Sequence, residues 1–306
     1  MLQILDHVPL APKTTMRIGG TARYFAELAT KEDVEEAYAF AQKNNLPLIV
    51  LGSGSNTIFA DKEIQALVVR IVATHLTIQP SNHPTISVMV ESGKNLPMLI
   101  NELAKAGLDL SPLTGIPGTV GGAIFGNAGQ GPKGIWIDHY VESVTAFVDG
   151  MWKECNKEEC HFRYRESVWK DAPQFVAEDR DLPLQIAPII WSVTLNIPQN
   201  DPTIIKEKIE QLLKHRIETQ PHQRTAGSCF KAIGETPAWQ LIDAAKLRGI
   251  KKGGVQISEK HANFLISDKG ATFEDAVNVV NTVKEKILEK LEVEMRFVKP
   301  DGSLLF

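Results

Sequence analysis

The sequence has little cysteine, no long apolar run and no excess of positive charge, and each shortage excludes a class of protein. Three cysteines in 306 residues form no disulfide framework, which is typical of a reducing, cytoplasmic compartment. No apolar stretch reaches about 18 residues, and the N-terminus lacks a basic region followed by an apolar run, so we expect neither a membrane span nor a signal peptide. A net charge of -4 excludes a globally basic surface for nucleic acid.

Metal-binding spacings are also missing. Cys155 and Cys160 are followed by His161, but this matches no common zinc pattern and no second pair completes it. No metal spacing is formed by three further histidines, His215, His222 and His261. We therefore expect packed thiols and no metal site.

The remaining composition is that of a globular protein with several subdomains. Hydrophobic residues make up 43% and charged residues 23%, which are ordinary values. A chain of 306 residues exceeds one compact core, so we expect three units, 1–64, 65–198 and 199–306. The last boundary follows a composition shift at Pro198-Gln199-Asn200-Asp201-Pro202.

Hydrophobic periodicity predicts a mixed arrangement of helices and strands. Thr30 is suited to cap a helix over Lys31–Lys43, and Asp149-Gly150 predicts a hairpin between strands 140–148 and 151–154. Further helices are expected over 95–106, 203–218 and 272–291, and further strands over 24–28, 47–51, 66–71, 76–79, 86–91, 189–197 and 293–298. The apolar stripe of the 272–291 helix indicates core packing.

A first glycine-rich stretch directly follows an apolar strand and consists of Gly52, Ser53, Gly54, Ser55 and Asn56. Glycine allows backbone N–H groups to approach a phosphate closely and to adopt positive φ angles. The stretch has neither the G-x-G-x-x-G spacing nor a G-K-[ST] sequence, so it is neither a Rossmann fingerprint nor a P-loop. Taken alone, it is read as a tight turn.

A second glycine-rich stretch changes that interpretation. It contains the residues Gly115, Ile116, Pro117, Gly118, Thr119, Gly121 and Gly122. A short helix beginning near Thr119 would direct N–H groups toward an anion. Two such loops in one chain favour a dinucleotide that lies between two subdomains.

Seven motifs in this order make the chain similar to a known family. They are Thr15-Met16-Arg17-Ile18-Gly19-Gly20, Leu51-Gly52-Ser53-Gly54-Ser55-Asn56, Gly115-Ile116-Pro117-Gly118-Thr119-Val120-Gly121-Gly122, Asn127-Ala128-Gly129, Tyr164-Arg165-Glu166-Ser167, Gly227-Ser228-Cys229-Phe230-Lys231 and Glu292-Val293-Glu294-Met295-Arg296-Phe297. The chain resembles the UDP-N-acetylenolpyruvoylglucosamine reductase (MurB) family over nearly its whole length. The short stretch between Ser228 and Glu294 resembles the compact subclass, which lacks a tyrosine-bearing loop over the substrate.

The resemblance implies an α+β fold and a two-step reduction. An FAD-binding module of the vanillyl-alcohol-oxidase (PCMH) type would have two subdomains, 1–64 and 65–198, and would be followed by an α/β substrate-binding domain, 199–306. NADPH would reduce non-covalent FAD and leave, and an enolpyruvyl UDP-sugar would then take its place. N5 of the reduced flavin would deliver hydride to the vinyl carbon, which gives UDP-N-acetylmuramate for peptidoglycan. We expect a monomer.

The resemblance also assigns residues to the reaction, which builds enolate charge on the substrate carboxylate. Arg165 would bind that carboxylate through two parallel bonds, and Glu294 would be its acidic partner. Ser228 would donate the proton. Alternation along the last strand leaves Glu294 opposite Val293 and Met295, and we expect the Glu294 carboxyl to be protonated or tied to a cation.

Other residues are candidates for binding the substrate. The resemblance implies Tyr164, Asn127 and Lys231, and Lys231 is also a candidate to polarise Ser228. Candidates for the UDP phosphates are Lys231, Arg224, Lys251 and Lys252. The family usually has Asn-Pro where this chain has Ala232-Ile233, so substrate contacts there are expected to differ.

Two other functions fit parts of the pattern. A different flavoenzyme on the same module, such as a sugar oxidase, often tethers FAD through His or Cys near the first loop, and none lies between Leu46 and Leu67. A non-catalytic nucleotide-binding protein would not require Arg165, Ser228 and Glu294 together. The sequence therefore favours a reductase with non-covalent FAD.

Overall fold

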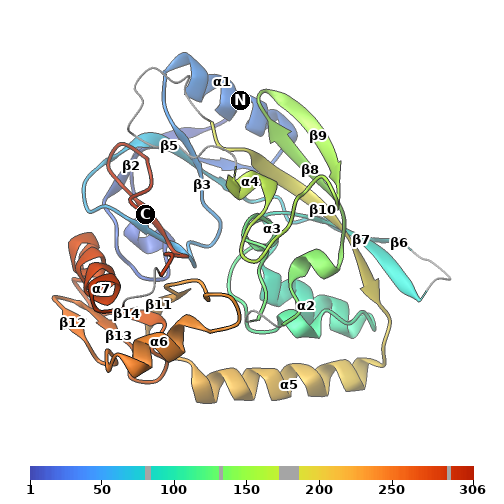
Figure 1. Cartoon of the computed structure of the whole chain (residues 1–306). Helices are drawn as coiled ribbons and strands as arrows, with labels where there is room; N and C mark the ends of the chain where they lie inside the picture. The colour runs from blue at the N-terminus through green and yellow to red at the C-terminus, as the bar shows by residue number, and fades with distance from the viewer. Residues whose placement is uncertain (80–83, 131–133, 172–185, 288–290) are drawn as a thin grey trace.

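The computed structural model describes residues 1–79, 84–130, 134–171, 186–287 and 291–306 (Figure 1). The described residues form three main sheets, one for each expected unit. None of the helices within these ranges is long and apolar enough to cross a membrane.

The first sheet has the strand order β1-β2-β5-β3. β1 is antiparallel to β2, whereas β5 runs parallel to both β2 and β3. Its elements are β1 (Ile4–Pro9), η1 (Ala11–Lys13), β2 (Thr21–Leu28), α1 (Lys31–Lys43), β3 (Leu48–Val50) and β5 (Ile64–Ile71). Thr30 caps α1 in a capping box with Asp33, as the sequence predicts. The apolar face of α1, with Val34 and Ala37, packs on this sheet.

The second sheet is antiparallel, in the order β6-β7-β10-β8-β9. Its elements are β6 (Leu76–Gln79), β7 (Thr85–Glu91), α2 (Leu96–Lys105), η2 (Ser111–Leu113), α3 (Val120–Phe125), η3 (Ile137–His139), β8 (Val141–Val148), β9 (Met151–Asn156), α4 (Val168–Asp171) and β10 (Ile189–Pro198). Asp149 and Gly150 both have positive φ, as their hairpin requires. The α2 and α3 side chains share one core with this sheet.

The C-terminal domain is a third sheet, β11-β14-β13-β12, with two helices. Its elements are β11 (Arg224–Ser228), α6 (Ala238–Ala244), β12 (Lys251–Lys252), β13 (Val255–Ile257), β14 (Phe264–Ser267) and α7 (Phe273–Lys286). The chain end then returns to the first unit, where β15 (Arg296–Val298) pairs in parallel with β4 (Thr57–Phe59). This return places the C-terminus beside the first sheet (Figure 1).

Helix α5 (Pro202–Thr219) bridges the second unit and the C-terminal domain (Figure 1). Its first half buries Ile205 and Ile209 in the core of the second unit. Asp109, which is buried, accepts hydrogen bonds from Ser111 and from Lys208 of α5, the latter at 2.8 Å. This anchor fixes the direction in which the C-terminal end of α5 extends.

Two sequence-predicted element ends differ from the structure. α7 ends at Lys286, because Ile287 is already extended, and the predicted helix to 291 is therefore too long; residues 288–290 lie outside the described residues. The predicted strand 293–298 is reduced to β15, with Val293 forming only an isolated bridge to Phe230. In the second place, Val293 and β15 pair with segments that lie far away in the sequence.

Two unit boundaries also look different in three dimensions. β5 belongs to the first sheet, so that sheet continues to Ile71 and past the boundary expected at residue 64. The start of α5 packs on the second unit, although residue 199 was expected to begin the C-terminal domain. We propose that the boundaries lie after Ile71 and within α5.

The Asp109 anchor predicts a pH-dependent stability. Burial raises the pKa of Asp109, but hydrogen bonds from Lys208, Ser111 and Asn200 outweigh it and lower the pKa from 3.8 to about 2. A depressed pKa in the folded state stabilises the fold above the unfolded pKa, and this stabilisation is lost as the pH falls from about 4 to about 2. Asp109→Asn should therefore lower the free energy of unfolding by about 1–2 kcal/mol at pH 7, and by less near pH 3.

Urea unfolding of Asp109→Asn and wild type at several pH values measures this difference. The matched control is Asp6→Asn, because Asp6 is exposed on β1. An equal loss for Asp109→Asn at pH 7 and pH 3 would contradict the ionic anchor.

Candidate active site

A large cavity lies where the three units meet. Its volume is about 1250 Å³, which exceeds the range of about 300–1,000 Å³ usual for one small ligand. Both glycine-rich loops line it from one side, and β11, α6 and the β15 segment line it from the other. The space therefore suits a dinucleotide together with a second molecule.

The first loop presents unused backbone donors to this cavity. Within the described chain, the N–H groups of Ser53, Gly54 and Ser55 make no hydrogen bond to another protein group. A Cβ on Gly54 would lie 2.3 Å from the carbonyl oxygen of Lys13, and its φ of +66° is also one that favours glycine. The loop is thus a close-fitting cradle for an anion such as a diphosphate.

The second loop lies against the first. Ser55 donates to the Pro117 carbonyl at 3.2 Å, and a Cβ on Gly52 would lie 2.8 Å from the Thr119 hydroxyl. Thr119 caps α3 through the Gly122 N–H. All twelve residues predicted to bind the cofactor line the cavity, so the structure brings them together.

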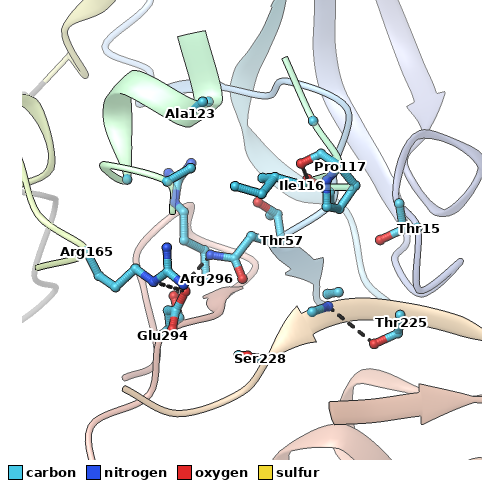
Figure 2. Close-up of a pocket in the computed structure, with 18 of the residues that line it drawn as sticks. Thr15, Thr57, Ile116, Pro117, Ala123, Arg165, Thr225, Ser228, Glu294 and Arg296 are labelled. Carbon is cyan, nitrogen blue, oxygen red and sulfur yellow. Dashed lines mark hydrogen bonds and ion pairs between the residues drawn. The ribbon is translucent and has the colours of Figure 1, made fainter. Parts of the chain in front are cut away.

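Arg165 projects into the cavity from a tight turn (Figure 2). Arg163 and Glu166 exchange two backbone hydrogen bonds of 3.1 Å, so Tyr164 and Arg165 occupy the corner. Arg165 has a φ of +61°, a left-handed conformation that is uncommon for a residue other than glycine. The Asn127 side chain supports the turn by donating to the Arg163 carbonyl at 3.0 Å.

The side chains of Glu294 and Arg165 point toward each other in the lining of the cavity (Figure 2). The Arg165 Nε lies 3.1 Å from the Glu294 Oε1, and both side chains are about 15% exposed. This distance makes an ion pair, but the direction is poor, and the Nε–H of Arg165 has no hydrogen-bond partner in the described chain. Burial raises the pKa of Glu294, and the charges of Arg165, Lys170 and Lys231 oppose that rise.

Backbone pairing fixes where Glu294 lies. Its N–H donates to the Cys229 carbonyl at 2.8 Å, and its carbonyl accepts from the Asn56 side chain at 3.1 Å. Met295 is buried on the opposite face, in agreement with the predicted alternation. The tie to a cation expected for Glu294 is confirmed by its ion pair with Arg165.

Ser228 lines the cavity at the end of β11, beside the Arg165–Glu294 pair (Figure 2). The register of β11 against β14 shifts between Thr225 and Ser228, and Gly227 has a φ of +79° there. Such a bulge re-aims the next side chain. Cys229 points the other way and is buried in the domain core, as the alternation of side chains predicts.

Two residues predicted to bind substrate do not line the described cavity. Lys231 pairs with Glu166 at 2.8 Å and Glu292 at 2.5 Å, so its ammonium joins the second unit to the C-terminal domain and does not polarise Ser228. Asn127 is fully buried and holds the turn of Arg163. We therefore propose that Lys231 and Asn127 support the site, and their predicted contact with substrate stays a prediction.

The other candidates divide between the cavity and the surface. Tyr164 lines the cavity, and its hydroxyl accepts a long, 3.4 Å hydrogen bond from the N–H of Ala232. Arg224 also lines the cavity. Lys251 and Lys252 are exposed on β12, away from the lining, and Lys251 pairs with Asp268.

Sequence reasoning missed two arginines of the lining. Arg296 lies two residues beyond Glu294, so strand alternation would have placed both on one face. Burial lowers the Arg296 pKa to about 10, and its Nε has no partner in the described chain. Arg216 of α5 donates to the Gly115 carbonyl at 2.6 Å, and no sequence signal separated it from other helix-surface arginines.

These features define an FAD-dependent oxidoreductase. A family model described as an FAD binding domain matches residues 22–156, which include the first loop and most of the second unit. A second model, described as the UDP-N-acetylenolpyruvoylglucosamine reductase C-terminal domain, matches residues 220–297. Ser228 and Glu294 lie inside that second match.

Whole-chain comparisons agree with both matches. UDP-N-acetylenolpyruvoylglucosamine reductase of Carboxydothermus hydrogenoformans is 32% identical over 95% of this chain and 91% of its own, and that of Aquifex aeolicus is 32% identical over 98% and 96%. The crystal structure of the Thermus caldophilus enzyme (MurB) superposes with a TM-score of 0.76 at 29% identity, covering 97% and 98% of the two chains. The chain belongs to the UDP-N-acetylenolpyruvoylglucosamine reductase family.

The shape of the first loop predicts a sharp contrast between two glycine substitutions. Gly54→Ala places a methyl group against backbone atoms of Lys13 and Thr14, so the loop must move and FAD should be lost. Gly234→Ala also has positive φ, but nothing lies within 4 Å of its Cβ, so it should lose only about 1 kcal/mol of stability and keep its FAD.

The measurement is the FAD released from each purified variant by heat denaturation, per mole of chain. Because we expect non-covalent FAD, all of the flavin should enter the supernatant. Equal FAD content in the two variants, or flavin left on the precipitated chain, would count against this cradle.

Proposed function

We propose that Arg165, Ser228 and Glu294 form the reducing site of this FAD- and NADPH-dependent UDP-N-acetylenolpyruvoylglucosamine reductase. Family membership supplies the overall reaction, which reduces the enolpyruvyl group of a UDP-sugar for peptidoglycan synthesis. The observation that supports the residue roles is their meeting in one cavity, although they are far apart in sequence.

The glycine loops and the cavity fit FAD. Free N–H groups of the first loop suit its diphosphate, and the contact between the two loops closes the site on one side. Bound FAD would supply the hydride chemistry that links NADPH to the vinyl carbon of the substrate. The protein residues must then hold the substrate carboxylate, supply a proton and exclude water.

Arg165 is suited to bind the substrate carboxylate. A guanidinium stays charged and offers parallel N–H groups that match the two oxygens of a carboxylate. Glu294 orients this guanidinium through the ion pair. Burial raises the pKa of Glu294, and the positive charge of Arg165 opposes that rise.

Ser228 is suited to give its hydroxyl proton to the carbon beside the carboxylate. The β11 bulge directs its side chain into the cavity, and the adjacent Glu294 backbone holds that strand end in place through Cys229. The UDP portion requires cations further along the cavity, and Arg224 and Arg248 line that part of the C-terminal domain.

NADPH consumption tests the overall function. Wild-type protein should oxidise NADPH rapidly only when UDP-N-acetylenolpyruvoylglucosamine is present, and UDP-N-acetylmuramate should accumulate in equal amount. Oxidation at the same rate without the sugar would instead indicate an oxidase that uses oxygen, and no oxidation at all would indicate a nucleotide-binding protein.

Ser228 and its neighbour Cys229 give a matched test of the proton donor. The proton is needed only after hydride has reached the substrate, so Ser228→Ala should bleach its flavin with NADPH at nearly the wild-type rate. Reoxidation by the enolpyruvyl sugar should be slower by about 10²- to 10⁴-fold. Cys229→Ala should perform both steps normally, because its thiol is buried in the domain core.

Stopped-flow absorbance of the flavin separates the two steps. Impaired NADPH reduction alone in Ser228→Ala, or impaired reoxidation in Cys229→Ala, would show that Ser228 is not the proton donor.

A further inference from the structure

Lys170 lies next to the proposed reducing site without a role in it so far. It belongs to α4, lines the cavity and donates from its Nζ to the backbone carbonyl of Arg165 at 2.8 Å. Its position is fixed locally, since its N–H donates to the Ser167 carbonyl and the Ser167 hydroxyl donates to Phe125 of α3. The backbone that carries the Lys170 side chain is therefore held in place by hydrogen bonds.

The Arg165 turn requires such a contact. A left-handed residue other than glycine is strained and persists only where its surroundings hold it in place, and Arg165 is such a residue. Asn127 fastens the Arg163 end of the turn, and Lys170 fastens the carbonyl of Arg165 itself. Without the second contact the backbone could relax and turn the guanidinium away from Glu294.

The charge of Lys170 matters as well as its hydrogen bond. A neutral amide would satisfy a carbonyl at lower desolvation cost than an ammonium group. Among the described residues, the charged groups that act on Lys170 include those of Lys231, Glu294, Glu166 and Glu292, and its ammonium group is hydrogen-bonded to the Arg165 carbonyl. Burial lowers the pKa of Lys170, and the nearby carboxylates oppose that lowering, so the carboxylates favour its cationic form.

We propose that Lys170 is a positioning residue for the reducing site, which holds the Arg165 turn in place and supplies a second cation beside Glu294. The proposal rests on the proposed function of Arg165 and Glu294. In this role Lys170 contacts the backbone of Arg165 and does not contact the substrate. Its loss should therefore affect the step that uses Arg165 and leave the reduction of the flavin by NADPH intact.

Three variants test this role. Lys170→Met keeps the length of the chain but removes the donor and the charge, and Lys170→Arg keeps both. Lys153→Met is the matched control, because Lys153 is exposed on β9 of the same unit and lies outside the cavity lining. Stopped-flow absorbance gives the rate of each half-reaction, and steady-state assays give kcat and KM.

In Lys170→Met, reoxidation by the enolpyruvyl sugar and kcat should fall by about 10- to 100-fold, as a displacement of about 1 Å produces. NADPH reduction and KM should stay within about threefold of wild type. Lys170→Arg should recover most of the lost kcat, and Lys153→Met should match wild type. A raised KM with unchanged kcat would show that Lys170 binds substrate instead, and an equal fall in both half-reactions would show general support of the fold; either overturns the proposal.

A readout without substrate separates this proposal from the proposed function. In protein with ¹⁵N-labelled arginine, the Nε–H signal of Arg165, assigned through Arg165→Lys, should move in Lys170→Met and stay in place in Lys153→Met. An unmoved signal overturns the positioning role, even if wild type reduces the sugar. A moved signal together with no sugar reduction by wild type would retain the positioning role and reject the proposed function.

Discussion

The ion pair between Arg165 and Glu294 is the interaction on which the site depends, because its two members come from different units of the chain. Arg165 belongs to a strained turn between β9 and β10 of the second sheet, and Glu294 lies where the chain end returns to the first loop. Asn56 connects the first loop to this chain end, because its side chain donates to the Glu294 carbonyl and its own carbonyl accepts from the Arg296 N–H. The loop that we propose to bind the cofactor therefore also sets the position of Glu294.

This arrangement explains why residues of little apparent importance accompany the reactive ones. Lys231 links the second unit to the C-terminal domain, because it pairs with Glu166 of the former and Glu292 of the latter. A second contact between the same two parts is made by α5, whose Lys208 donates to Asp109 of the second unit. The same helix positions Arg216 to donate to the Gly115 carbonyl. These contacts fix the relative positions of the units and therefore the shape of the cavity between them.

Much of the fold could be predicted from the sequence where local signals decide it. The Thr30 capping box and the Asp149-Gly150 hairpin appear as expected, since their partners are near in sequence. The role of Lys231 could not be predicted, because it depends on an ion pair with the distant residue Glu166. Motif order predicted that Arg165, Ser228 and Glu294 lie together, and strand alternation could have added Arg296, whereas the places of Arg216 and Lys170 in the lining become visible only when the domains are in place.

A double-mutant cycle on the flavin reoxidation rate tests the central claim that Arg165 and Glu294 act as one unit. The variants are Arg165→Met, Glu294→Gln and the two combined, each first reduced with NADPH and then mixed with the enolpyruvyl UDP-sugar. If the pair is the working unit, the double variant should be only slightly slower than the worse single variant, with a coupling energy of about 0.5–3 kcal/mol. Fully multiplicative losses would mean that the two residues act independently, which would contradict the account.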